Sequence, residues 1–218
     1  MTRAGAVEYI ARPMEPLPAP SLRFAAWLLL IGGALAVIGA CCPPYRQWSA
    51  PQEEGFRAIA GNPIGWWCIH SGFFLGTVVS LLGLASLASE LRGRAGGEWA
   101  LIAAVAFGIA ATAWIANLAY RVSIWSWAAQ TFTSTGVTPD AFAVWQRFAR
   151  ILFAIFSLVG YGSVGLLGIA LLRAGIGPAW LRWATLACGF SAGFVVGHNV
   201  PLIMYTPFVA LGVVLLRS

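Results

Sequence analysis

The chain has 218 residues, of which 60% are hydrophobic and 9% are charged, and its mean hydropathy is +0.81. Soluble domains carry roughly 25% charged residues, so this composition excludes an ordinary soluble domain and indicates that lipid surrounds most of the chain. All 13 basic residues are arginines, and the formal net charge is +6. Because these arginines are dispersed between apolar runs, membrane orientation explains them better than nucleic-acid binding does.

The N-terminal stretch is rich in proline and mixed in charge. It holds four prolines, two arginines and two glutamates, with too few apolar side chains to form a core. We expect a flexible cytoplasmic tail over residues 1–21. Residues 22–218 are expected to form a single transmembrane helical domain. Its predicted spans lie at about 22–42, 64–88, 99–120, 141–173, 179–197 and 201–216.

The first two predicted spans are separated by a polar stretch with a helix-start pattern. Ser49 and Pro51 precede a pair of glutamates, which predicts a short helix lying on the membrane surface. The second span then opens with Trp66 and Trp67. Indole rings prefer the headgroup boundary of a bilayer, so we expect both tryptophans to be interfacial anchors.

The third and fourth spans are joined by a longer connection. Trp125 and Trp127 predict a segment that lies along the interface and does not cross the membrane. The sequence Thr138-Pro139-Asp140 is typical of a helix start, with the threonine as cap and the proline at the first helical position. A helix from there to residue 173, at about 1.5 Å per residue, is longer than a bilayer is thick. We expect a projecting end or a bend near residues 160–162.

The last two spans are near the minimum crossing length. Gly197 fits the end of the fifth span, and Asn199 with Pro201 fits the cap and first position of the sixth. The alternative is one broken, re-entrant element and an odd number of spans. With the N-terminus inside, eight arginines fall on cytoplasmic segments and five on outer ones, as the positive-inside rule expects.

We therefore predict an all-α fold, a polytopic transmembrane helical bundle of about six spans in a bacterial inner membrane. Similar strings end the second, fourth and sixth spans, at residues 82–85, 167–170 and 211–214. Each is followed by an arginine, so the even spans look like variants of one another. This internal similarity predicts three stacked helical hairpins.

Three strings in the last third of the chain carry a resemblance to a known group. They are GLLGIALLR at 165–173, GPAWLRW at 177–183 and ALGVVLLR at 210–217. In these strings the chain resembles a broad group of six-span bacterial membrane proteins of unknown function. The resemblance implies a six-span helical fold, and it implies no activity and no catalytic residues.

Polar residues within or beside the apolar runs fall toward the predicted outer face. Such residues usually face a bundle interior or a water-filled cavity, which predicts a polar vestibule at that face. Its candidate members are Ser71, Asn117, Tyr120, Arg121, Gln146, Arg147, Arg150 and Asn199. The alternative is that they are interfacial residues at helix ends, where polarity costs little.

His70 is the histidine that lies well inside a span. Paired with His198, it would bind haem b through two axial imidazoles, or it would relay protons. The alternative is a structural hydrogen bond to a neighbouring helix. The chain has no zinc-ligand spacing, HExxH motif, phosphate loop or nucleophile elbow, so we predict no metal site and no catalytic residues.

Small residues at helical spacing predict close helix packing. These are Gly72 with Gly76, and the series Gly189, Gly193 and Gly197. The leading interpretation is an integral membrane bundle without a catalytic centre, acting as a structural, accessory or small-ligand-binding protein. The alternatives are a haem-binding or redox protein, and a transporter or channel that uses the outer vestibule. Expected partners are the lipid bilayer and another membrane protein or a second copy, and not nucleic acid.

Overall fold

The structure, a computed structural model, describes residues 19–41, 51–195 and 203–217. Over these residues the chain is helical and contains no strand. The helical elements are α1 (Ala19–Cys41), α2 (Gln52–Gly61), α3 (Pro63–Glu90), α4 (Gly97–Tyr120), η3 (Arg121–Trp125), α5 (Ser126–Thr135), α6 (Asp140–Ala174), α7 (Ala179–Val195), η4 (Ile203–Tyr205) and α8 (Thr206–Arg217). The element η3 is a π-helical turn and η4 is a 3₁₀ turn.

Four helices are long and apolar enough to cross a membrane. They are Leu22–Cys41, Pro63–Glu90, Gly97–Thr135 and Asp140–Ala174, and Ile203–Arg217 is a shorter apolar helix. A bilayer core is about 30 Å thick and needs roughly 20 helical residues to span it. The prediction of an all-helical membrane protein is therefore supported by the four long helices. The turn expected to hold Gly197, His198 and Asn199 lies outside the described residues.

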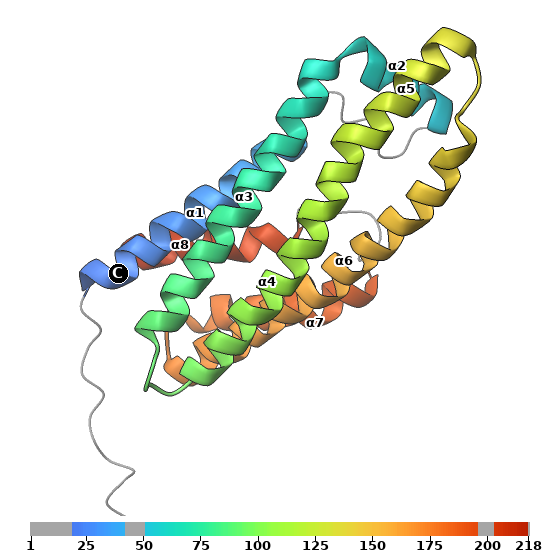
Figure 1. Ribbon diagram of the computed structural model, residues 1–218. Coiled ribbons are helices and arrows are strands. Elements are labelled where there is room, and N and C mark those ends of the chain that lie inside the picture. The colour runs from blue at the N-terminus through green and yellow to red at the C-terminus, as the bar shows by residue number, and fades with distance from the viewer. Residues whose placement is uncertain (1–18, 42–50, 196–202, 218) are drawn as a thin grey trace, which may run out of the picture.

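Two boundaries differ from those expected. The chain does not break after residue 120, because η3 carries the helix on into α5 as far as Thr135 (Figure 1). The helix α6 begins at Asp140, one residue later than expected, because Pro139 is its cap residue; no side chain caps the helix, so Thr138 does not have the expected role. The same helix runs unbroken through residues 160–162 for its full 35 residues.

Six helices form a ring in the order α1, α3, α4, α6, α7 and α8, and α8 returns to α1 (Figure 1). Neighbouring helices run antiparallel. For example, Gly32 of α1 lies against Ser80 of α3, and Gly39 lies against Gly72. Residue numbers therefore increase along α1 in the direction in which they decrease along α3. The most extensive contacts join α1 to α3 and α4 to α6, whereas α7 and α8 contact each other only slightly.

Glycines allow the closest of these contacts. A Cβ atom on Gly72 would lie 2.8 Å from the Cα of Gly39, and one on Gly76 would lie 2.6 Å from the backbone nitrogen of Ala36. On the other side of the ring, Gly189 of α7 lies against Gly165 of α6. Small residues at these positions let helix backbones approach where larger ones would hold them apart.

The short helix α2 packs on protein. Phe56 and Ile59 are buried, and the Phe56 ring centroid lies 5.1 Å from that of Phe142 in α6 and 5.6 Å from that of Phe132 in α5. The predicted short helix is therefore present, and its apolar face packs on α5 and the start of α6; its place at the membrane surface stays a prediction. The predicted cap Ser49 lies outside the described residues. This aromatic cluster is a second, smaller core beyond one end of the main bundle.

The antiparallel ring gathers arginines at the opposite end. The start of α1, the α3–α4 loop, the α6–α7 loop and the end of α8 all lie there (Figure 1). Among the described residues this end carries Arg23, Arg92, Arg94, Arg173, Arg182 and Arg217. The outer surface between the two ends bears exposed aliphatic side chains such as Val105 and Leu158, as expected of helices in contact with lipid.

Candidate functional site

The candidate site is centred on His70, two turns into α3. The helix starts at Pro63 because Asn62 caps it, its side chain accepting a hydrogen bond from the Gly65 N–H at 2.9 Å. From Trp66 onward, buried residues recur at three- and four-residue steps through His70 and Phe73. This spacing places Trp66 and His70 one above the other on the inward face of α3. His70 is only 2% exposed.

The orientation of the His70 ring is fixed by its own helix. Its Nδ1 lies 2.6 Å from the carbonyl oxygen of Trp66, and the two ring centroids are 4.0 Å apart. A carbonyl oxygen can only accept a hydrogen bond, so Nδ1 carries the proton and donates it. In the neutral imidazole the lone pair therefore belongs to Nε2, which makes that atom a hydrogen-bond acceptor.

A chain of hydrogen bonds holds Trp66 in place. Its Nε1–H donates to the carbonyl oxygen of Arg121 at 3.1 Å. The Arg121 Nε–H donates to Asn117 Oδ1 at 2.7 Å, and Asn117 Nδ2 donates to the carbonyl of Ala149 at 2.7 Å. These bonds tie α3, α4 and α6 together at the level of His70. Buried polar groups that are satisfied in this way make the arrangement specific as well as stable.

The π-helical turn makes the bond to Trp66 possible. A π turn widens the helix and changes the partners of its backbone carbonyls, and such turns are frequent at functional sites. In η3 the first residue is Arg121, whose carbonyl accepts from the Trp66 indole. The turn thus presents a main-chain acceptor to α3 at the point where a tryptophan donor is available.

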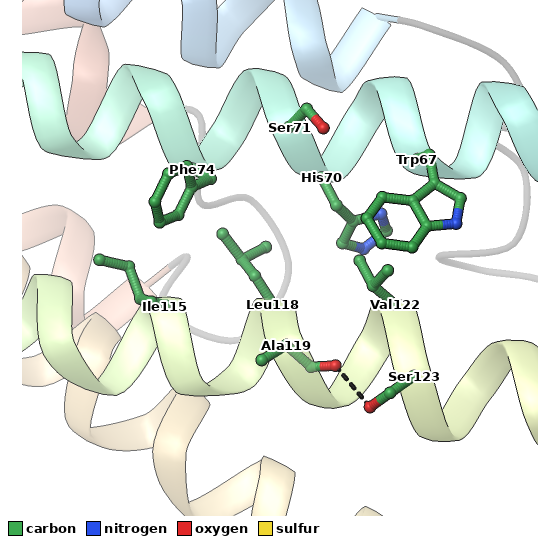
Figure 2. A pocket seen from close by; sticks show the side chains of 9 residues that line it. All are labelled: Trp67, His70, Ser71, Phe74, Ile115, Leu118, Ala119, Val122 and Ser123. Carbon is green, nitrogen blue, oxygen red and sulfur yellow. Dashed lines mark hydrogen bonds between the residues drawn. The ribbon is translucent and has the colours of Figure 1, made fainter.

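His70 lines an apolar groove between α3 and α4. The groove has a volume of about 450 Å³. Figure 2 shows Trp67, His70 and Phe74 of α3 on one side, facing Ile115 and Leu118 of α4 and Val122 of η3 on the other. Ser71, Ala119 and Ser123 complete the lining, and the Ser123 hydroxyl donates to the carbonyl of Ala119 at 2.7 Å. The groove is thus mainly apolar, and its polar lining consists of the His70 imidazole and the hydroxyl groups of Ser71 and Ser123.

The groove opens toward the outside of the bundle. The Trp67 side chain is 57% exposed and Phe74 is 42% exposed, and both stand at its edge. The inner wall is closed by the buried Leu118 and by His70 itself. In a membrane, a molecule dissolved in lipid would reach this groove without crossing the core of the protein.

The structure brings together only part of the predicted vestibule. Asn117, Tyr120 and Arg121 lie near His70, on α4 and the first residue of η3. Ser71 lines the groove but is exposed. Three residues of α6 do not line the groove. They are Gln146, which is half-buried, and Arg147 and Arg150, which are exposed. Asn199 lies outside the described residues.

Of the two predicted haem ligands, His70 and His198, only His70 lies within the described residues. His70 has the burial expected of an axial ligand, but His198 lies outside the described residues, so their pairing stays a prediction. Within residues 19–41, 51–195 and 203–217, no three histidine, cysteine or acidic side chains come together to hold a metal ion. Cys68 is exposed while His70 is buried, as expected for side chains two positions apart on a helix.

Sequence reasoning misread the tryptophans nearest the site. Trp66 was expected at the membrane interface, yet it is fully buried and bonded to Arg121. Its neighbour Trp67 is the exposed one and borders the groove. The signal was present in the spacing, because Trp66, His70 and Phe73 share one helical face while Trp67 does not.

Comparison of the chain with models of known families, with curated proteins and with solved structures finds no match. The resemblance to six-span membrane proteins of unknown function therefore remains a prediction from the sequence.

Proposed function

We propose that this protein is a multi-pass integral membrane protein that binds an apolar small molecule in the α3–α4 groove. The observation that carries the proposal is the buried imidazole of His70 lining a mainly apolar groove that opens toward the outside of the bundle. Ligand sites are usually apolar cavities of about 300–1,000 Å³ with a small number of placed polar groups, and this groove fits both terms. The bundle then acts as a binding or accessory protein without a catalytic centre.

The tautomer of His70 defines the chemistry of the ligand. Since Nδ1 donates to the Trp66 carbonyl, the acceptor of the neutral ring is Nε2, on a side chain that lines the groove. A ligand that carries a hydroxyl group donates to this atom, whereas a ligand with only carbonyl oxygens does not. We therefore propose an apolar molecule with a hydroxyl group, such as a phenol or a quinol, held between Trp67 and Phe74 on one side and α4 on the other.

The proposal also includes the membrane arrangement. Six membrane segments, paired as three hairpins, place the ends of the helical domain on the cytoplasmic side of a bacterial inner membrane. Support comes from the antiparallel ring and from the arginines gathered at the end where α1 begins and α8 ends. In a cysteine-free background, a membrane-impermeant maleimide applied to intact cells should label Val137→Cys and leave Ala95→Cys unlabelled. The reverse pattern would invert the topology.

The ligand proposal is tested with decylubiquinol and decylubiquinone, a matched pair that differs in hydrogen-bond donation. Binding to the detergent-solubilised protein is followed anaerobically by quenching of tryptophan fluorescence. We expect the quinol to bind several-fold more tightly than the quinone. His70→Ala should remove this preference, with a loss of quinol affinity of about five- to tenfold for one hydrogen bond.

A pair of alanines on α4 supplies the control. Ala119 lines the groove and Ala116 does not, although both are exposed. Ala119→Phe should abolish binding of both probes, and Ala116→Phe should leave it unchanged. Equal binding of quinol and quinone, or binding that survives Ala119→Phe, would contradict the proposal. A Soret band that is lost in His70→Ala would instead support haem binding.

A further inference from the structure

A second apolar groove lies between α3 and α4 at the arginine-rich end of the bundle. Its volume is about 430 Å³, and its walls include Leu81 and Ala85 of α3 and Leu101 and Val105 of α4. The two α4 side chains are 55% and 57% exposed, respectively, so the groove faces the outside of the bundle. It spans about 12 Å along α3, from Leu81 to Ser89, at about 1.5 Å per residue. That length accommodates part of a lipid acyl chain.

A polar pocket of about 390 Å³ adjoins this groove at the α3–α4 loop. Gly93 and Glu98 line both spaces, so the two lie side by side. The pocket is lined by Arg94 from the loop and by Arg173 from the last turn of α6, and Arg92 lines the adjoining groove. The linings of the two spaces together contain three arginines and one acidic residue, Glu98, so basic residues outnumber acidic ones there.

The fold builds this pocket through the shape of the loop. Gly96 has φ = 88°, and a Cβ atom on it would collide with the carbonyl oxygen of Ala170 in α6. Only glycine adopts this conformation readily and permits so close a contact. The loop is thus seated directly on the end of α6. This contact is the reason why Arg94 and Arg173, far apart in the sequence, line one pocket.

We propose that this pocket and groove together bind one anionic phospholipid. The phosphate lies between Arg94 and Arg173, and one acyl chain lies in the groove between Ala85 and Leu101. Charge complementarity identifies the headgroup, because basic pockets between helices on the cytoplasmic side attract anionic lipids. The half-buried Trp99 lines the polar pocket, where indoles favour the headgroup level. The site is separate from the His70 groove, which lies at the other end of the same two helices.

Native mass spectrometry of the detergent-solubilised protein tests the headgroup. The protein is offered equimolar phosphatidylglycerol and phosphatidylcholine with identical acyl chains. We expect preferential retention of phosphatidylglycerol, and a loss of that preference by about fivefold for each arginine removed in Arg94→Ala and Arg173→Ala. Arg23→Ala is the matched control, because Arg23 lies at the same end and lines neither space. Lysine at positions 94 and 173 should restore most of the preference.

The groove distinguishes a lipid from a free phosphate ion. Ala85→Phe fills the groove and should reduce phosphatidylglycerol retention, whereas Ala184→Phe, on an exposed position of α7, should not. An excess of inorganic phosphate should fail to displace the lipid. Displacement by phosphate together with unchanged retention in Ala85→Phe would assign the pocket to a free anion and overturn the proposal. Equal retention of the two lipids by the wild-type protein would also overturn it, whether or not any variant folds.

Discussion

The two neighbours of α3 pack against it in opposite ways. Toward α1, Gly72 and Gly76 bring the backbones into contact, so that an added methyl group would meet main-chain atoms. Toward α4, larger side chains hold the helices apart, and a Cβ atom on Gly108 would meet only the Leu81 side chain, at 3.8 Å. Both grooves lie on this second contact. One face of α3 is therefore in close backbone contact with α1, while its other face forms a wall of both grooves.

The largest expected effect comes from breaking the close contact. Gly76→Ala should destabilise the protein by about 3 kcal/mol, because the new methyl group would displace the backbone of α1 at Ala36 and Gly32. Thermal unfolding in detergent measures the change. The control is Gly108→Ala on the open contact, which we expect to be neutral or to stabilise by up to about 1 kcal/mol through its higher helix propensity. Equal destabilisation by the two variants would show that the contacts do not differ.

A smaller loss should follow from cutting the hydrogen bonds that anchor α4 to α6. Asn117→Leu removes the donation to Ala149 and the acceptor for Arg121. We expect a loss of about 2 kcal/mol, because a half-buried charged donor loses this acceptor and the carbonyl of Ala149 loses this donor. The same variant should weaken quinol binding, since Trp66 and His70 are positioned through this chain of bonds. An unchanged unfolding temperature would mean that the stability of the protein does not depend on the hydrogen bonds of Asn117.

The adjacent residues Trp66 and Trp67 of α3 are expected to differ in their effects on stability and on binding. Trp66→Phe removes the hydrogen bond to the Arg121 carbonyl and should cost about 1 kcal/mol of stability. Trp67→Phe should leave stability unchanged but reduce quenching by bound decylubiquinol, because Trp67 borders the groove. Unfolding and binding measured on the same two samples separate these effects. A loss of stability in Trp67→Phe with reduced quenching in Trp66→Phe would contradict the buried position of Trp66 and the place of Trp67 at the groove.

The smallest effect is expected where the open groove is filled. Ala119→Phe places a ring in space that the protein leaves unoccupied by its own side chains, so stability should change by no more than about 0.5 kcal/mol. Chemical unfolding of this variant beside Ala116→Phe measures the difference. A loss of several kcal/mol would mean that the groove is too narrow for a ligand.

Local features of the sequence were sufficient to predict most helix positions. The start of α6 at Asp140 and its end near residue 173 follow from a proline-acid pair and from a glycine after an arginine, which act within one turn. The depth of His70 followed from counting residues along its span. Such features need no knowledge of the neighbouring helices.

The site itself depends on contacts that no local pattern encodes. The bond from Asn117 to Ala149 joins residues 32 positions apart, and the bond from Trp66 to Arg121 joins residues 55 positions apart. The grooves exist because of the spacing between α3 and α4, which is set by how each packs on its other neighbour. The spacing along α3 separates Trp66 from Trp67, but it does not reveal that the Trp66 indole is bonded to the Arg121 carbonyl.

The π turn at residues 121–125 has a consequence for the whole length of its helix. A straight α-helix advances by about 100° per residue, so one additional residue in a wide turn resets the direction in which all later side chains point. Below the turn, Trp114 faces the main core, and above it Phe132 faces Phe56 in the smaller core. Removing a single residue from the turn would rotate Phe132 by roughly a quarter of a circle and uncouple the two cores. The π turn therefore sets the rotation about the helix axis that lets one continuous helix place side chains in both cores.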